Sequence, residues 1–165
     1  MRIPVTEDDT DAAELYKAVL EAGGHVVLSA SDGRRCLNLY KAAMAEINSN
    51  GRSSKVPFDA VVLDHMMPFV NGLNVAKEIL STCPDQRIII ASAYLKESLN
   101  DSLNELNQIV EIMLKPFEPE MLAEVIEDVS VVEKLQKLNT GVQNDDAGVD
   151  QLLVQLKAIQ KLGTI

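Results

Sequence analysis

The sequence contains no tryptophan, and aromatic residues make up only 4% of its 165 residues. Its two cysteines, Cys36 and Cys83, lie too far apart for a metal-binding motif, so we expect both to be reduced and to pack in the interior. No segment approaches the roughly 18 apolar residues of a membrane span, and the N-terminus lacks the apolar stretch of a signal peptide. We therefore expect a cytoplasmic protein that does not bind membranes.

Positive charge is also scarce, because 15 Lys and Arg residues stand against 25 Asp and Glu residues and give a net charge of −10. Such a chain repels the phosphate backbone of nucleic acids, so direct nucleic-acid binding is not expected. Hydrophobic residues, in contrast, make up 47% of the sequence, which is enough to form the core of one domain of this length.

Four short apolar runs each deliver polar side chains at their carboxyl end. The runs and their polar residues are 3–5 with Glu7 and Asp8, 61–63 with Asp64, 88–91 with Ser92, and 109–114 with Lys115. Any one of the acids, taken alone, could be a turn former or a helix cap. In an open parallel sheet, however, ligands bind outside the carboxyl ends of the strands. The recurrence therefore predicts one site assembled from four segments.

Between these runs, apolar residues recur at helical spacing, and the alternation of strands with helices predicts a parallel sheet. The expected strands are about 3–6, 25–30, 61–63, 88–91 and 109–114, and the expected helices are about 11–22, 32–47, 73–80, 95–106 and 118–139. Residues 48–57 predict a polar surface loop, either a tolerated insertion, which we favour, or a docking loop for a partner. The expected fold class is therefore α/β, with a doubly wound parallel sheet of five strands.

The order of the motifs resembles that of the receiver domain of two-component response regulators, and most closely its single-domain, CheY-like chemotaxis type. The motifs are Glu7-Asp8, Asp64 with Met67-Pro68 and Gly72, Ser92-Ala93, and Lys115-Pro116-Phe117. None is specific alone, but together they are. The resemblance covers residues 1–130 and implies a flavodoxin-like sheet in the order 2-1-3-4-5. Residues 131–165 would extend the last helix, form a linker at 140–148 and end in a short amphipathic helix.

The resemblance implies that Asp64 accepts a phosphoryl group from a histidine kinase or a phosphotransfer protein. An acyl phosphate is a recognised covalent use of an aspartate. Because the transferred group is nearly all charge, the protein mainly has to position and neutralise it. Lys115 would contact one phosphoryl oxygen, and the Ser92 hydroxyl would donate to another. The protein would act as a signalling phosphoacceptor rather than as an enzyme.

The resemblance also implies a bound Mg²⁺ ion, or Mn²⁺ in its place. Asp8 and Asp64 would bind the ion directly, Glu7 through a water molecule, and Met66 through its backbone carbonyl. Oxygen ligands of this kind suit Mg²⁺, which prefers octahedral coordination and keeps several waters.

Phosphorylation adds about two negative charges and strong acceptors, which can reorder a loop through new hydrogen bonds. We expect Ser92 to be the main switch residue. Ile112 stands where the family usually has a Tyr or Phe that rotates inward on activation, so that part of the switch does not transfer, and Tyr94 is the candidate to replace it. The family also has a cis peptide bond at the position of Lys115-Pro116. The output would be a changed surface recognised by a downstream protein target.

Three alternatives remain open. Pro4 is a poor fit for a central strand, because it lacks a backbone donor, and it favours a receiver-like module that binds proteins without phosphorylation. A phosphohydrolase that uses an aspartyl phosphate would need an acid at position 66, where a Met stands. The terminal helix either packs back on the domain or pairs with a partner or a second copy in a homodimer. Next to Asp64, we expect His65 to be an exposed loop residue.

Overall fold

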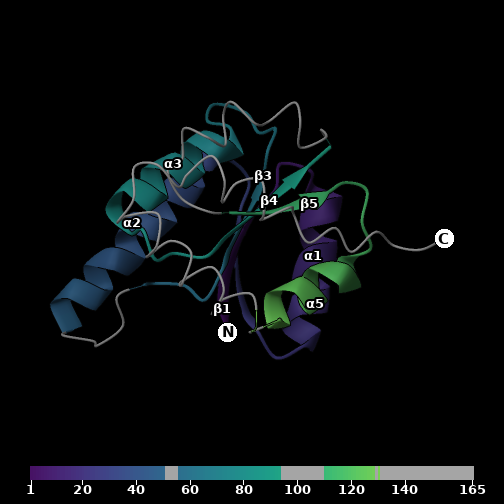
Figure 1. The fold of residues 1–165 in the computed structure, drawn as a ribbon, viewed down its shortest axis with the longest axis horizontal. Coiled ribbons are helices and arrows are strands. Elements are labelled where there is room, and N and C mark those ends of the chain that lie inside the picture. The colour runs from purple at the N-terminus through teal and green to yellow at the C-terminus, as the bar shows by residue number, and fades with distance from the viewer. Residues whose placement is uncertain (51–55, 94–109, 129, 131–165) are drawn as a thin grey trace, which may run out of the picture.

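The computed structural model describes residues 1–50, 56–93, 110–128 and 130. The described strands form one parallel sheet in the order β2-β1-β3-β4-β5 (Figure 1). They are β1 (Arg2–Thr6), β2 (Val26–Ala30), β3 (Val61–Asp64), β4 (Ile88–Ser92) and β5 (Glu111–Leu114). The predicted fold class and strand order are therefore confirmed.

Helices cover both faces of this sheet. Helices α1 (Thr10–Ala22) and α5 (Pro119–Glu127) lie on one face, and α2 (Gly33–Asn50) and α3 (Gly72–Thr82) lie on the other (Figure 1). The helix predicted over 95–106 lies outside the described residues. In the part of the chain that is described, no helix combines the length and the apolar character that crossing a membrane requires.

The central strands are buried on both sides because each face of the sheet carries helices. All residues of β3 and β4 are buried, which explains their nearly continuous apolar sequences. The helices on the two faces close two separate hydrophobic clusters. Cys36 and Cys83 both lie in the cluster under α2 and α3 as buried free thiols, as predicted. This packing fixes the two strands that end in Asp64 and Ser92.

Pro4 disturbs the sheet only locally. Strand β1 pairs with β2 over all five of its residues, but with β3 only at Val5 and Thr6. The Arg2 carbonyl accepts a hydrogen bond from the Asp59 N–H, just before β3, and Pro4, two residues further along, faces the same neighbour. Because proline has no N–H, β1 donates nothing to β3 at that point. The predicted disturbance is confirmed, and the sheet accommodates it by beginning the β1–β3 ladder after the proline.

Two predicted boundaries were wrong, and the first is the end of α2. The loop was expected to begin at Asn48, but α2 continues to Asn50. In this last turn the Ser49 hydroxyl donates to the Glu46 carbonyl at 3.1 Å, so a residue of modest helix propensity is held inside the helix by its own side chain. Residues 51–55 of the expected loop lie outside the described residues.

The second wrong boundary is the end of α5, because this helix was expected to run to about residue 139. The helix ends at Glu127, and Asp128 leaves the helical conformation with φ −72° and ψ 89°. Asp128 Oδ1 accepts hydrogen bonds from the N–H and the hydroxyl of Ser130, at 3.1 and 2.7 Å. An aspartate that bonds nearby groups in this way competes with continuation of the helix. The expected linker and terminal helix, within 131–165, lie outside the described residues.

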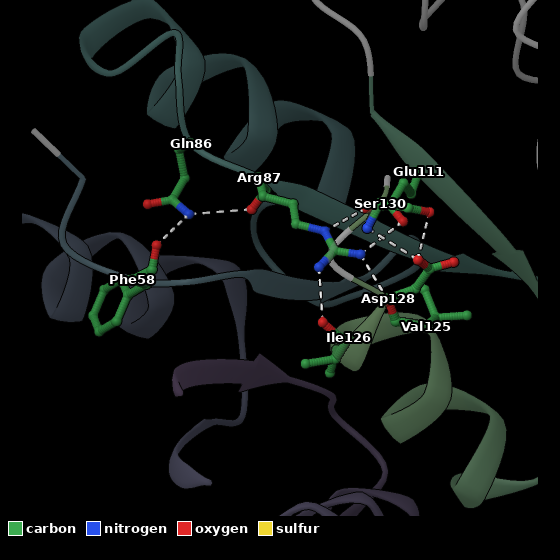
Figure 2. A network of polar contacts seen from close by, with 8 residues as sticks. All are labelled: Phe58, Gln86, Arg87, Glu111, Val125, Ile126, Asp128 and Ser130. Atoms are coloured by element: carbon green, nitrogen blue, oxygen red, sulfur yellow. Dashed lines mark hydrogen bonds and ion pairs between the residues drawn. The ribbon is translucent and has the colours of Figure 1, made fainter. Parts of the chain in front are cut away.

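A buried arginine, Arg87, connects α5 to the sheet at the amino-terminal ends of the strands (Figure 2). Arg87, just before β4, donates from Nε and Nη2 to the two carboxylate oxygens of Glu111 in β5, at 2.6 and 3.0 Å. Its Nη1 and Nη2 also donate to the carbonyls of Ile126 and Val125, at 2.9 and 2.7 Å. The guanidinium thus supplies donors to two carbonyls of the last turn of α5, where helical partners run out. The Val125 carbonyl also accepts from the Asp128 N–H, at 3.3 Å.

Candidate functional site

Three of the predicted site residues meet at the carboxyl ends of β1, β3 and β5. Lys115 Nζ donates to Glu7 Oε2 at 2.6 Å and to Asp64 Oδ1 at 2.7 Å. Glu7 and Asp64 are buried, whereas Lys115 retains a partly exposed side chain. Residues more than fifty positions apart in the sequence are therefore joined by one ammonium group.

The backbone carries these side chains to the same place because hydrogen bonding continues past the strand ends. The Glu7 N–H donates to the Ala30 carbonyl at 3.1 Å, and the Lys115 N–H donates to the Ser92 carbonyl at 2.8 Å. The Lys115–Pro116 peptide bond is cis.

The turn after β3 is tight and depends on a glycine. The Gly72 N–H donates to the His65 carbonyl at 3.0 Å, which closes the loop between β3 and α3. A Cβ atom at position 72 would lie 2.2 Å from the Asp64 carbonyl oxygen, so only glycine fits this close approach. Asn71 then caps α3 by accepting from the Asn74 N–H at 2.8 Å.

The carboxylates of Glu7, Asp8 and Asp64 form a cluster suited to a metal ion. One oxygen atom from each of the three lies within 4.8 Å of the others. Asp8 is exposed, so the cluster opens to solvent on one side. Carboxylate oxygens at this spacing are ligands that a hard divalent cation prefers.

The cluster carries more negative than positive charge, and the pKa values of Glu7 and Lys115 are shifted within it. Burial raises the pKa of Glu7, and the charge of Asp64 raises it further, although the hydrogen bond from Lys115 opposes both. Burial alone would lower the pKa of Lys115, but hydrogen bonds to Asp64 and Glu7 outweigh it and leave this pKa raised. Lys115 is therefore held in its charged form, yet one ammonium cannot neutralise three carboxylates. This excess of negative charge attracts a further cation.

Ser92 ends β4 beside the cluster and is fully buried. Its hydroxyl lies 3.2 Å from Nδ1 of His65. The expectation of an exposed loop histidine at position 65 is wrong, since His65 is only 9% exposed. The backbone N–H of His65 donates to the Ala91 carbonyl at 2.8 Å, so the residue stays hydrogen-bonded to β4 instead of entering an exposed loop. Burial lowers the pKa of His65, against the opposing charge of Asp64.

The remaining predicted positions are placed as follows. Ile112 pairs with Ile90 in the sheet and packs, half-buried, against the cluster under α2 and α3. Tyr94 lies outside the described residues. The Met66 side chain is 57% exposed in the loop after Asp64.

Two contacts of aromatic rings in the segments around the site were not predicted from the sequence. Tyr16 of α1 stacks on Phe117, two residues after Lys115, with ring centroids 5.4 Å apart. Phe69, in the loop before α3, is 81% exposed and has a positive φ of 66°. The Arg34 guanidinium lies 5.5 Å from the centre of its ring. Nothing local in the sequence marks either pair, because each joins residues that are distant along the chain.

Comparisons with known proteins agree with this fold and site. The family model described as the response regulator receiver domain matches residues 3–127. Response regulator MprA of Mycolicibacterium vanbaalenii is 34% identical over 123 residues, which cover 74% of this chain and 47% of MprA. Chemotaxis protein CheY of Thermotoga maritima is 25% identical over 130 residues, which cover 78% of this chain and 97% of CheY. The chain therefore spans about half the length of MprA.

A solved structure gives the same result. The response regulator protein TrrA of Thermotoga maritima, in complex with Mg²⁺-BeF, is 27% identical with a TM-score of 0.57, and the match covers 78% of this chain and 97% of TrrA. Receiver domains are signalling domains rather than classical enzymes. With the family model matching most of the chain, and with the strand order and the acidic cluster in place, this chain belongs to the response regulator receiver domain family.

Proposed function

We propose that this chain accepts a phosphoryl group on Asp64 in a reaction that requires Mg²⁺, and that it signals by a conformational change. The observation that carries the proposal is the buried Asp64 carboxylate at the end of β3, 2.7 Å from Lys115 Nζ and within 4.8 Å of carboxylate oxygens of Glu7 and Asp8. A nucleophile, a fixed positive charge and a set of metal ligands are the parts that phosphoryl transfer needs.

The donor is a phosphohistidine on a histidine kinase or a phosphotransfer protein of the cytoplasm. An Asp64 oxygen forms a bond to phosphorus while the phosphorus–nitrogen bond breaks, and the electron pair of that bond returns to the imidazole of the donor. Asp64 needs no general base, because the carboxylate attacks in its ionised form. The product is an acyl phosphate.

A divalent cation fits the residues that are present. Glu7, Asp8, Asp64 and the Met66 carbonyl would hold Mg²⁺, or Mn²⁺, and the ion would supply positive charge to the transferred group. The Mg²⁺-BeF complex of the similar protein TrrA supports this assignment. The surplus of carboxylates over ammonium groups in the cluster is the independent support from this chain.

Lys115 changes partners during the reaction. In the present arrangement its ammonium group is shared by Glu7 and Asp64. An ammonium on a flexible stem can turn from the acceptor carboxylate to an oxygen of the new phosphoryl group with little movement of the backbone. Lys115 thereby neutralises the nucleophile before transfer and the product after it.

Ser92 is the switch residue of this proposal. Its hydroxyl would leave its present partner and donate to a phosphoryl oxygen, which links the modification to the segment that follows β4. Ile112 provides no aromatic ring for the second part of the family's switch, and Tyr94 is the proposed replacement. Residues 1–130 form the receiver domain in this proposal, and residues 131–165 act as an extension that serves the downstream target or a homodimer.

The test is intact mass spectrometry after incubation with acetyl phosphate, with and without Mg²⁺. Wild type should gain one phosphoryl group only when Mg²⁺ is present, and Asp64→Asn should gain none. Asp85→Asn is the matched control, because it makes the same chemical change at an exposed acid of the loop between α3 and β4. An equal gain in Asp64→Asn would place the acceptor elsewhere. No gain in wild type would favour a protein-binding module that works without phosphorylation.

A further inference from the structure

The contact between His65 and Ser92 joins a residue outside the family's motifs to the residue that we assign as the switch. His65 Nδ1 lies 3.2 Å from the Ser92 hydroxyl oxygen. Both side chains are buried, and Ser92 is fully so. The phosphoryl chemistry proposed above gives His65 no task.

Rigid backbone on both sides fixes this contact. The His65 N–H donates to the Ala91 carbonyl at 2.8 Å, and Asp64 is in register with Ala91 in the β3–β4 ladder. Ser92 is the last residue of β4 and is in register with Leu114 of β5. The backbone positions of the two residues are therefore set by the sheet, and the hydroxyl can leave the imidazole by side-chain rotation without movement of the backbone.

We propose that His65 is a positioning residue that accepts a hydrogen bond from the Ser92 hydroxyl and so holds the switch in its unphosphorylated arrangement. This inference rests on the proposed function of Ser92. A neutral imidazole has one N–H donor and one acceptor nitrogen, and a serine hydroxyl has a single proton to donate. While that proton is donated to Nδ1 it cannot be donated to a phosphoryl oxygen. His65 and the phosphoryl group thus compete for the same hydroxyl proton.

The competition sets the size of the expected effect. The net contribution of a neutral hydrogen bond in a protein corresponds to roughly a 2- to 12-fold change in an equilibrium constant. Removing the acceptor on His65 should therefore strengthen binding of a phosphoryl analogue by about that factor. The gain should vanish when Ser92 has no hydroxyl.

The first experiment measures the affinity of the full chain for beryllofluoride in the presence of Mg²⁺. His65→Leu keeps side-chain volume without an acceptor, and His65→Asn keeps a polar atom near the place of Nδ1. Each is combined with Ser92 and with Ser92→Ala. We expect His65→Leu to bind beryllofluoride more tightly than wild type by roughly 2- to 12-fold, and His65→Asn to bind it with nearly the wild-type affinity. In the Ser92→Ala background, neither substitution at position 65 should change this affinity.

If His65→Leu raised the affinity for beryllofluoride by the same factor in the Ser92→Ala background, the cause would be a general packing effect, and the proposal would be overturned. An unchanged or weaker affinity in His65→Leu would overturn it too. In that case the imidazole would not compete for the hydroxyl.

The second experiment needs neither a phosphoryl analogue nor a variant at position 65. Nitrogen-15 NMR of the imidazole of His65 should show an N–H at Nε2 and an unprotonated Nδ1, whose chemical shift changes in Ser92→Ala. An N–H at Nδ1 would make the serine an acceptor and overturn the proposal. If wild type failed to bind beryllofluoride while the NMR result held, the proposed function would fail and the hydrogen bond to His65 would stand.

Discussion

Replacing Arg87 tests how the sheet holds α5. In Arg87→Met an unbranched side chain of similar length stays in place, while the four hydrogen bonds that end at Glu111, Val125 and Ile126 are lost (Figure 2). The arginine side chain is 5% exposed and that of Glu111 is 13% exposed, so solvent replaces few of the lost partners. The variant therefore leaves a carboxylate buried without its counter-charge.

The size of the expected loss in free energy of unfolding follows from the burial of this ion pair. Removing one partner of a buried ion pair destabilises a protein by about 3–5 kcal/mol, mainly because the remaining charge has no partner. The Ile126 carbonyl loses the donor that Arg87 supplies, and the Val125 carbonyl keeps only the Asp128 N–H at 3.3 Å, which favours the upper half of this range. For a domain of this size, we expect the midpoint of thermal unfolding to fall by about 10 °C.

The assay is urea unfolding followed by far-ultraviolet circular dichroism, which gives the free energy of unfolding. The double variant Arg87→Met/Glu111→Met removes both charges, and it should recover most of the loss because apolar residues of similar volume often replace a buried pair at little cost. Arg35→Met is the matched control. Its guanidinium, 3.4 Å from Asp32, is 72% exposed, so we expect a loss below about 1 kcal/mol.

Two results would refute this reasoning. A free energy of unfolding of Arg87→Met within about 1 kcal/mol of wild type would mean that the buried pair contributes no more than an exposed one does. The double variant could also be no more stable than the single one. The unpaired charge of Glu111 would then not be the cause of the loss.

Three further predictions concern single residues. Because burial raises the pKa of Glu7, this carboxylate gains a proton at a higher pH than an ordinary glutamate does. The affinity for Mg²⁺, measured by calorimetry, should therefore fall as the pH is lowered from 7 to 5. Glu7→Gln should bind Mg²⁺ more weakly, and its affinity should depend less on pH. Burial raises the pKa of the Cys36 thiol to about 11, so iodoacetamide at pH 8 should alkylate it only in urea, and rapid labelling of the native protein would contradict this. Gly72→Ala should lower the free energy of unfolding by about 1–3 kcal/mol through its clash with the Asp64 carbonyl, and an unchanged midpoint in thermal unfolding would argue against that clash.

The sequence was sufficient to predict the sheet and the convergence of its polar strand ends. Strands β3 and β4 are buried on both faces, so their composition alone marks them, and the rule for parallel sheets places Asp64 and Lys115 at one edge. The burial of His65 could not be predicted in this way, because the residue's contacts, with the Ala91 carbonyl and the Ser92 hydroxyl, are with the neighbouring strand. Sequence spacing within one strand contains no information about that partner.

The helix ends and the Arg87 contacts were missed for related reasons. Asn48 was assigned to a loop because the residues around it are polar, yet α2 continues through it to Asn50. Asp128 ends α5 through a bond of its side chain to Ser130, which a search for apolar periodicity does not detect. Arg87 meets carbonyls that lie 38 and 39 residues away, and backbone carbonyls leave no trace in a sequence.

Strand β4 connects the Arg87 contacts with the candidate switch. Arg87 immediately precedes the strand and Ser92 ends it, while β3 and β5 pair with it on either side. Sliding β4 along its axis would break both ladders and pull Arg87 away from α5, so the strand is a poor candidate for the moving part. Rotation of the Ser92 side chain, in contrast, breaks no bond of either ladder. A partner that competes for its hydroxyl, as we propose for His65, therefore acts on a step that leaves the sheet intact.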